Sequence, residues 1–189
     1  MTTIHFDLLA RSYDRLIPPP APERLAQVLG LPTAGWLLDM GGGTGRVAAT
    51  LRPQVGRLVI SDLSVPMLAQ ATAKGIACAV QAQAEGLPFP SGHFERILVV
   101  DALHHFADQR RAVGELLRVL RPGGRLVIEE PDISRLPVKA MALAERLALM
   151  GSRFFTPDQI AAMAAGDGYT VAVERDQRFS AWVIVDRRP

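Results

Sequence analysis

The chain has 189 residues, a length that fits one domain better than two and can bury a sizeable core without disulfides. Its single cysteine, Cys78, excludes an internal disulfide and a cysteine-based zinc site. The net charge is only +2 and no dense run of lysine or arginine occurs, so the composition argues against nucleic acid as a partner.

The first thirty residues predict a helical cap on the rest of the chain. Residues 4–17 carry a mixed helical pattern, which ends at three consecutive prolines that predict a linker or a rigid turn. A helix is then predicted from Pro22 to Leu29, because proline suits a first helical turn and Gly30 suits a C-terminal stop.

Residues 31–130 alternate short apolar runs with helical stretches. We predict strands at 36–38, 57–60, 77–80, 96–100 and 125–129. Single helices are predicted at 44–51 and 65–74, and more than one helix is predicted within 102–120. The apolar runs are nearly continuous, which is typical of strands that are buried on both faces. This part of the chain therefore predicts a parallel sheet with helices on both sides.

Residues 131–189 have a different pattern. A long apolar helix is expected from Val138 to Met150 and a short one from Pro157 to Ala165. Two strands, Tyr169–Arg175 and Phe179–Asp186, should follow as a hairpin that adds an antiparallel strand to the sheet. The complete expectation is a single α/β domain with a doubly wound, mostly parallel, seven-stranded sheet and a C-terminal antiparallel hairpin.

The start of the chain lacks the features of a secretory signal, and no apolar run approaches the roughly 20 residues that span a bilayer. We therefore expect a cytoplasmic protein that does not insert into membranes. Whether it forms a homodimer is left open.

A glycine-rich loop follows the first predicted strand and precedes a helix. Gly41, Gly43 and Gly45 lie two residues apart, and Asp39 precedes them. A dinucleotide fingerprint needs a third glycine where Arg46 stands, and a P-loop needs Lys-Ser/Thr after its last glycine. The loop therefore matches neither of these two phosphate-binding motifs. The remaining interpretations are a close backbone approach to another ligand or a simple tight turn.

Asp62 directly follows the second predicted strand. The end of that strand should lie beside the glycine loop, where a carboxylate can accept hydrogen bonds from both hydroxyls of a ribose. The alternative is a capping residue for the next helix, with Ser61 and Ser64 as competitors. Together with the glycine loop, Asp62 favours the ribose role.

Five segments of the chain resemble the type 11 methyltransferase domain, within the class I S-adenosylmethionine methyltransferases that include the ubiquinone/menaquinone-biosynthesis enzymes. The segments occur in the family's order: Phe6-Asp7 with Tyr13-Asp14, Leu38–Gly45, Ser61–Ser64 with Met67-Leu68, Gln83–Pro90, and Leu120–Leu126. The resemblance implies a Rossmann-like fold, S-adenosylmethionine as cofactor, and a small-molecule methyl acceptor.

The resemblance also assigns candidate cofactor-binding residues: Tyr13, Asp39, Gly41, Gly43, Gly45, Asp62, Leu63, Met67, Gln83, Ala84, Glu85 and Asp101. One residue departs from the family's pattern, because the adenine loop usually begins with Asp and here begins with Gln83. A glutamine oxygen still accepts a hydrogen bond from the adenine amino group, but the bond is no longer charge-assisted. We therefore expect a lower cofactor affinity, not its loss.

The pair His104-His105 follows the fourth predicted strand, at the edge of the sheet where such folds bind ligands. Either histidine is a candidate general base, needed only if the acceptor still carries its proton. A metal site is not expected, because adjacent histidines on a helical segment should diverge and no third ligand is suitably spaced. We treat His5 and His93 as incidental.

The acceptor should contact two regions, Phe6–Ile17 and Pro131–Phe155, the second of which is strongly apolar. Those side chains either cover the sheet or face the active site; in the second case the acceptor is apolar or aromatic. Two other functions stay open: a non-catalytic protein that binds S-adenosylmethionine or S-adenosylhomocysteine, and another reaction on the same fold, such as an NAD-dependent one.

Overall fold

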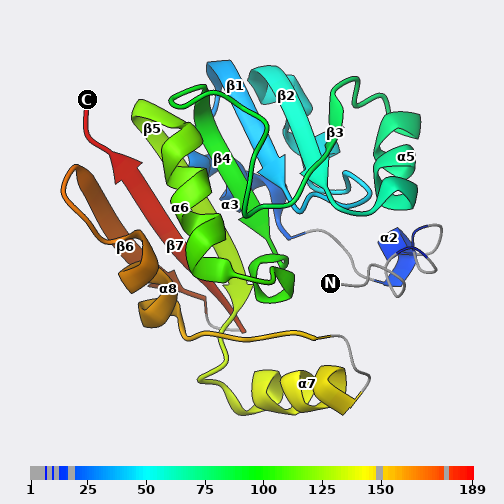
Figure 1. The fold of residues 1–189 in the computed structure, drawn as a ribbon. Helices are drawn as coiled ribbons and strands as arrows, with labels where there is room; N and C mark the ends of the chain where they lie inside the picture. Colours follow the sequence, from blue (N-terminus) through cyan, green and yellow to red (C-terminus); the bar gives the residue numbers. More distant parts are fainter. Residues whose placement is uncertain (1–6, 8–9, 11–12, 17–19, 148–150, 177–178) are drawn as a thin grey trace.

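The computed structural model describes residues 7, 10, 13–16, 20–147, 151–176 and 179–189. Its centre is a seven-stranded sheet with the order β3-β2-β1-β4-β5-β7-β6 (Figure 1). The parallel strands are β1 (Thr33–Met40), β2 (Val55–Asp62), β3 (Ala79–Gln81), β4 (Phe94–Val100) and β5 (Leu120–Pro131). The predicted doubly wound, mostly parallel sheet is confirmed.

The predicted hairpin at the end of the chain is also confirmed. It consists of β6 (Tyr169–Arg175) and β7 (Ser180–Arg187). Strand β7 lies between β5 and β6 and pairs antiparallel with both, in the register Val127↔Ile184 on one side and Ala172↔Ile184 on the other. The antiparallel strand therefore lies inside the sheet, and β6 forms its edge.

Helices cover both faces of the sheet. Helices α6 (Gln109–Val119) and α8 (Pro157–Ala164) pack on one face, and α3 (Pro22–Leu29), α4 (Ala48–Leu51) and α5 (Val65–Ala73) pack on the other. Two apolar clusters result, because neighbouring residues of a strand point to opposite faces: Leu38 and Ile128 join one cluster, and Leu37 and Val127 join the other. This double burial explains why the central strands read as continuous apolar runs.

One predicted helix is wrong in part. The helix expected at 44–51 begins only at Ala48, because Gly41, Gly43 and Gly45 have positive φ angles that a helix does not allow. The helices expected within 102–120 are a 3₁₀ turn, Leu103–His105, and α6, which starts after Asp108. The Asp108 carboxylate caps α6 by accepting a hydrogen bond from the Arg111 amide at 3.0 Å.

Other boundaries differ less. Strand β5 begins at Leu120, five residues earlier than expected, and takes in the turn residues 122–124. Helix α7 spans Leu136–Leu147 and lies beyond the carboxyl ends of the parallel strands (Figure 1). Of the N-terminal helical pattern, the structure describes α2 (Tyr13–Leu16); Phe6 and His5 lie outside the described residues. None of the described helices has the length and apolar character to cross a membrane.

Candidate functional site

A cavity opens at the carboxyl edge of the sheet, between the loops that follow β1, β2, β3 and β4. The chain proceeds from β1 to β2 and β3 on one side and then crosses to β4 and β5 on the other. In open α/β sheets a ligand binds at such a reversal of strand order. The cavity collects these predicted site residues: Tyr13, Gly41, Gly43, Asp62, Leu63, Met67, Gln83, Ala84, Glu85, Asp101 and His105.

Bare backbone forms the floor of this cavity at Gly41 and Gly43. Their φ angles are +72° and +54°, a region that side chains other than glycine rarely adopt. A Cβ atom on Gly41 would lie 2.6 Å from the Cβ of Ala102, so the loop also packs closely against the end of β4. The amide of Gly41 donates to the Ser61 carbonyl at 2.7 Å, which fixes the loop against β2.

The Asp62 carboxylate lies beside this loop. Its Oδ2 accepts a hydrogen bond from the Gly43 amide at 2.9 Å, and its Oδ1 accepts one from the Ser64 amide at 2.8 Å. Burial raises the pKa of Asp62, and these backbone bonds act in the opposite direction. A carboxylate has about four acceptor positions, so these backbone bonds leave acceptor capacity for the hydroxyls of a ribose. Asp62 and the glycine loop therefore fit a nucleoside.

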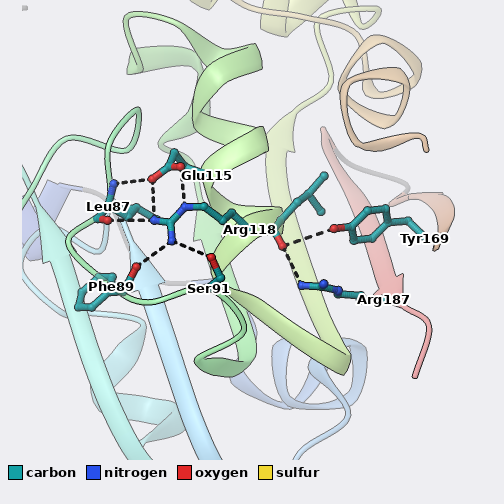
Figure 2. Close-up of polar contacts among 8 residues, drawn as sticks. Leu87, Phe89, Ser91, Glu115, Arg118, Tyr169 and Arg187 are labelled. Atoms are coloured by element: carbon teal, nitrogen blue, oxygen red, sulfur yellow. Dashed lines mark hydrogen bonds and ion pairs between the residues drawn. The ribbon is translucent and has the colours of Figure 1, made fainter. Parts of the chain in front are cut away.

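Helix α6 braces the loop that follows β3, as Figure 2 shows. Glu115 accepts a hydrogen bond from the Leu87 amide at 2.8 Å, and Arg118 donates to the carbonyls of Leu87 and Phe89 at 3.0 and 2.9 Å. Arg118 and Glu115 also form an ion pair at 2.7 Å. This brace fixes the segment that brings Gln83 and Ala84 to the cavity. Sequence reasoning missed it, because an i,i+3 charge pair on a helix is common.

The N-terminal segment reaches the cavity through Tyr13. The Arg46 guanidinium lies 5.9 Å from the centre of the Tyr13 ring. Burial raises the pKa of Tyr13, with the charge of Asp101 adding to the effect. Next to it, Asp14 binds the Thr44 hydroxyl and the Lys74 ammonium, so α2 is tied to the glycine loop.

Two predicted cofactor residues, Asp39 and Gly45, do not line the cavity. Asp39 is 1% exposed below the glycine loop, and burial raises its pKa to about 7 against the attraction of Arg46. A Cβ atom on Gly45 would meet the Cδ1 atom of Ile76 at 2.4 Å, so this glycine is required for packing against the turn after α5. Both residues support the loop from below.

Asp101 directly follows β4 and has a φ of +52°, the one positive φ angle found at a described residue other than glycine. A left-handed conformation is strained for such a residue and is common at functional sites. Burial raises the pKa of Asp101 to about 6, with the charge of His104 opposing the shift. At neutral pH its side chain is therefore largely ionised at the edge of the cavity.

The two histidines have different environments. His104 is 3% exposed and does not line the cavity; its Nδ1 lies 2.5 Å from Glu130, and its ring stacks on Phe154 at 4.3 Å. Burial by itself would lower the pKa of His104, but the Glu130 carboxylate raises it. His105 does line the cavity, where burial and the charge of His104 lower its pKa to about 3.

Glu130 is a site residue that sequence reasoning missed. Its Oε1 accepts hydrogen bonds from the amides of Ala102 and Leu103 at 2.9 and 2.7 Å, while its other oxygen holds His104. One buried carboxylate thus fixes the whole turn after β4. The only sequence signal was the occurrence of two acids, Glu129 and Glu130, at the end of a buried strand.

The expectation that the adjacent histidines diverge is wrong. Their ring centroids are 4.0 Å apart, because the 3₁₀ turn holds both rings under residues 151–155. Glu145 of α7 approaches them, so that one ligand atom from each of the three residues lies within 4.8 Å of the others. No spacing in the sequence indicated this contact.

A second cavity, of about 390 Å³, adjoins the first at Asp101, which lines both. Its other lining residues come from the segment before α3, the loop after β1, the ends of β4 and β5, helix α7 and the start of β7. They include Arg46, Glu129, Val138, Met141 and Phe179. The carboxyl edge of the sheet therefore carries two neighbouring sites.

Residues 38–128 match a family model described as a methyltransferase domain. The chain is 41% identical over 101 residues to a demethylmenaquinone methyltransferase of Thermus thermophilus, which covers 50% of this chain and 46% of that protein. It is 37% identical over 114 residues to a ubiquinone/menaquinone biosynthesis C-methyltransferase of Pseudomonas fluorescens, covering 55% and 44%. The matches thus span less than half the length of these relatives.

Solved structures resemble the whole chain. A possible histamine N-methyltransferase of Thermotoga maritima superposes with a TM-score of 0.81 at 20% identity, over 99% of this chain and 100% of that one. A putative methyltransferase of Haloferax volcanii, solved with the Trm112 activator, gives 0.80 at 16% identity over 97% and 98%. These neighbours establish the Rossmann-like methyltransferase fold. The family model itself matches residues 38–128, so the core of this chain is similar to methyltransferase domains in sequence as well as in fold.

Proposed function

We propose that this protein is an enzyme that transfers a methyl group from S-adenosylmethionine to a small apolar or aromatic metabolite. The observation that carries the proposal is the placement of Asp62 beside the bare backbone of Gly41 and Gly43, in a cavity that meets a second cavity at Asp101. The names of the relatives, which act in quinone biosynthesis, support an aromatic acceptor.

In this proposal the first cavity holds the cofactor. Asp62 binds the ribose hydroxyls, while Leu63, Met67 and the loop Gln83–Glu85 surround the adenine. Tyr13 covers the opening. Asp39 and Gly45 act indirectly, by supporting the loop on which Gly41 and Gly43 lie.

S-adenosylmethionine supplies a methyl group on a positively charged sulfur, so the displacement needs little covalent help from the protein. The residues have to align the acceptor and exclude water, which can lower a barrier by several kcal/mol. Asp101 lines both cavities and adds a negative charge where they meet.

The three parts of the chain then have separate roles. Residues 1–30 form the cap that contains Tyr13, residues 31–130 bind the cofactor, and residues 131–189 provide the acceptor side and the hairpin. Of the two candidate bases, His105 faces the cofactor cavity and His104 fixes the turn after β4. A proton-transfer role for either remains a prediction.

Isothermal calorimetry tests the cofactor assignment. We expect S-adenosylmethionine and S-adenosylhomocysteine to bind, and NAD not to bind. If NAD bound and S-adenosylmethionine did not, the proposal would be wrong.

Catalysis needs its own test, because a protein that only binds the cofactor would pass the first one. A metabolite extract is incubated with the protein and S-adenosylmethionine that is isotopically labelled in the methyl group. The expected result is a labelled small molecule, identified by mass. Cofactor binding without any labelled product would favour the non-catalytic binding protein.

A further inference from the structure

The second cavity contains a carboxyl group that the proposed function leaves unused. Glu129, near the end of β5, lines this cavity and not the cofactor cavity. Its side chain is 7% exposed, and its Oε2 has no hydrogen-bond partner among the residues that the structure describes. A buried carboxyl oxygen without a partner is uncommon and calls for a functional explanation.

The surroundings of Glu129 keep this carboxyl group close to its titration point at neutral pH. Burial raises the pKa of Glu129 to about 7, while a hydrogen bond with Ser180 of β7 works in the opposite direction. Three charged groups also change the pKa of Glu129. The carboxylates of Asp101, after β4, and Glu130, on β5, raise it further, and the guanidinium of Arg46 lowers it. Helix α7 contributes only Pro137, Val138 and Met141 to the cavity, so it adds no titratable group there.

The remaining wall of the cavity is apolar. Pro131, Val138, Met141 and Phe179 line it. Met141 is 37% exposed and Phe179 50% exposed, so a ligand in the cavity would bury further apolar surface of both side chains. An apolar wall beside the carboxyl groups of Asp101, Glu129 and Glu130 suits a ligand that has a hydrophobic body and one polar hydrogen.

We propose that the second cavity is the methyl-acceptor site, that it binds an aromatic hydroxyl compound such as a phenol or naphthol, and that Glu129 accepts the hydroxyl proton. This inference rests on the proposed function. The Glu129 carboxylate takes the proton from the hydroxyl, and the acceptor oxygen forms a bond to the methyl carbon. The carbon–sulfur bond breaks, its electron pair stays on sulfur, and Glu129 later releases the proton to water.

The two histidines suit this role less well than Glu129. His104 does not line either cavity and is held by Glu130. His105 lines the cofactor cavity, and its pKa of about 3 makes it a weak base at neutral pH. Asp101 is a competitor, because it lines both cavities. Glu130 also lines the second cavity, but its two oxygens are engaged by the amides of Ala102 and Leu103 and by His104.

The first experiment tests where the acceptor binds. Protein saturated with S-adenosylhomocysteine is titrated with 1-naphthol in a calorimeter. Met141→Trp fills the cavity, so we expect it to weaken naphthol binding at least about 10-fold, the effect of losing a well-fitted apolar contact surface. Leu143→Trp is the matched control: Leu143 is on the same helix, is 58% exposed and does not line the cavity. Its naphthol affinity should equal that of the wild type.

The second experiment tests the role of Glu129. Glu129→Gln keeps the shape of the side chain but cannot take a proton, so we expect methylation of 1-naphthol to slow about 100-fold or more. The wild-type rate at saturation should rise with pH and level off above about 7, where Glu129 is ionised. This rise should be lost in Glu129→Gln and kept in Asp101→Asn. The affinity for S-adenosylmethionine should be unchanged in Glu129→Gln.

Each failure has a distinct meaning. If S-adenosylmethionine itself does not bind, the proposed function fails. If the cofactor binds but 1-naphthol does not, or if both tryptophan variants bind naphthol equally well, the acceptor site is placed wrongly. If Glu129→Gln methylates naphthol at the wild-type rate, or if the pH dependence disappears only in Asp101→Asn, Glu129 is not the base.

Discussion

The loops after β1, β2 and β3 and the ends of β4 and β5 meet at one edge of the sheet but are built differently. In the first group, main-chain amides of Gly43 and Ser64 surround a single carboxylate, Asp62. In the second group, the buried or half-buried acids Asp101, Glu129 and Glu130 lie close together. The first arrangement suits recognition of a fixed ligand, and the second suits chemistry that depends on protonation.

The energetic consequences differ as well. At Asp62 the backbone amides of Gly43 and Ser64 donate hydrogen bonds to the carboxylate and bring no further charge to it. Crowded acids in a dry environment disfavour the ionised form, so their pKa values rise to about 6 for Asp101 and about 7 for Glu129. The acids of the reaction side are thus poised to respond to modest pH changes near neutrality, whereas the backbone hydrogen bonds at Asp62 oppose the rise in its pKa.

The largest expected effect tests the recognition side. Asp62→Asn should weaken S-adenosylmethionine binding at least about 100-fold, because hydrogen bonds to a charged group contribute about 1.5–3 kcal/mol each and two are affected. Calorimetry measures the affinity. Glu129→Gln serves as the control from the reaction side, where cofactor affinity should not change. Equal losses in both variants would remove the distinction between the two sides.

A smaller effect, on the free energy of unfolding, is expected from adding a side chain at Gly41, where the glycine loop packs closely against Ala102 after β4. Gly41→Ala introduces a Cβ atom 2.6 Å from Ala102 in addition to the strain of a positive φ angle. Gly75→Ala is the control, because its φ is +83° but nothing lies within 4 Å of the new atom. Both variants should lose about 1–2 kcal/mol through backbone strain, and Gly41→Ala about 1–3 kcal/mol more through overpacking. Urea unfolding measures the difference; equal stabilities would show that the loop adjusts freely.

Asp39 is an exception on the recognition side, because it is a buried acid. Its pKa is about 7 when folded and 3.8 in the unfolded chain, so the folded state binds the proton more tightly. The resulting stabilisation is complete below about pH 4 and is lost as the pH rises through about 7. We therefore expect Asp39→Asn to stabilise the cofactor-free protein at pH 8 by roughly 1 kcal/mol relative to wild type, and by less at pH 5.

Thermal unfolding at the two pH values measures this change, and calorimetry shows whether the variant still binds cofactor. If Asp39→Asn stabilised the protein less at pH 8 than at pH 5, each compared with wild type at the same pH, the raised pKa of Asp39 would be contradicted.

The smallest effect concerns the brace of the adenine loop. Arg118→Met removes the hydrogen bonds to the carbonyls of Leu87 and Phe89 but keeps an apolar stem on α6. Because these bonds are half-exposed, we expect the cofactor affinity to fall only about 3- to 10-fold. Arg110, which is exposed on the same helix, provides the control variant Arg110→Met. An unchanged affinity in Arg118→Met would mean that the loop is held without the brace.

The same division explains what the sequence could predict. The glycine loop, Asp62 and the alternation of strands and helices follow from residues that are neighbours in the chain or that repeat with the period of a strand. The roles of Glu130, Glu129 and Glu115 do not, because each depends on an element more than twenty residues away: the turn after β4, the start of β7 and the loop after β3. Asp39 matched the family's motif, but its depth below the loop could be known only from the packing.

The position of β7 has a consequence for assembly of the sheet. Strands β6 and β7 can pair locally, but β6 has no hydrogen-bonded neighbour other than β7 among the described strands. The hairpin must therefore dock on β5 as a unit, and this contact joins residues that are 49 to 61 positions apart in the chain. A change that prevents docking would detach two strands at once and leave the backbone of β5 as an open edge, which is a template for aggregation.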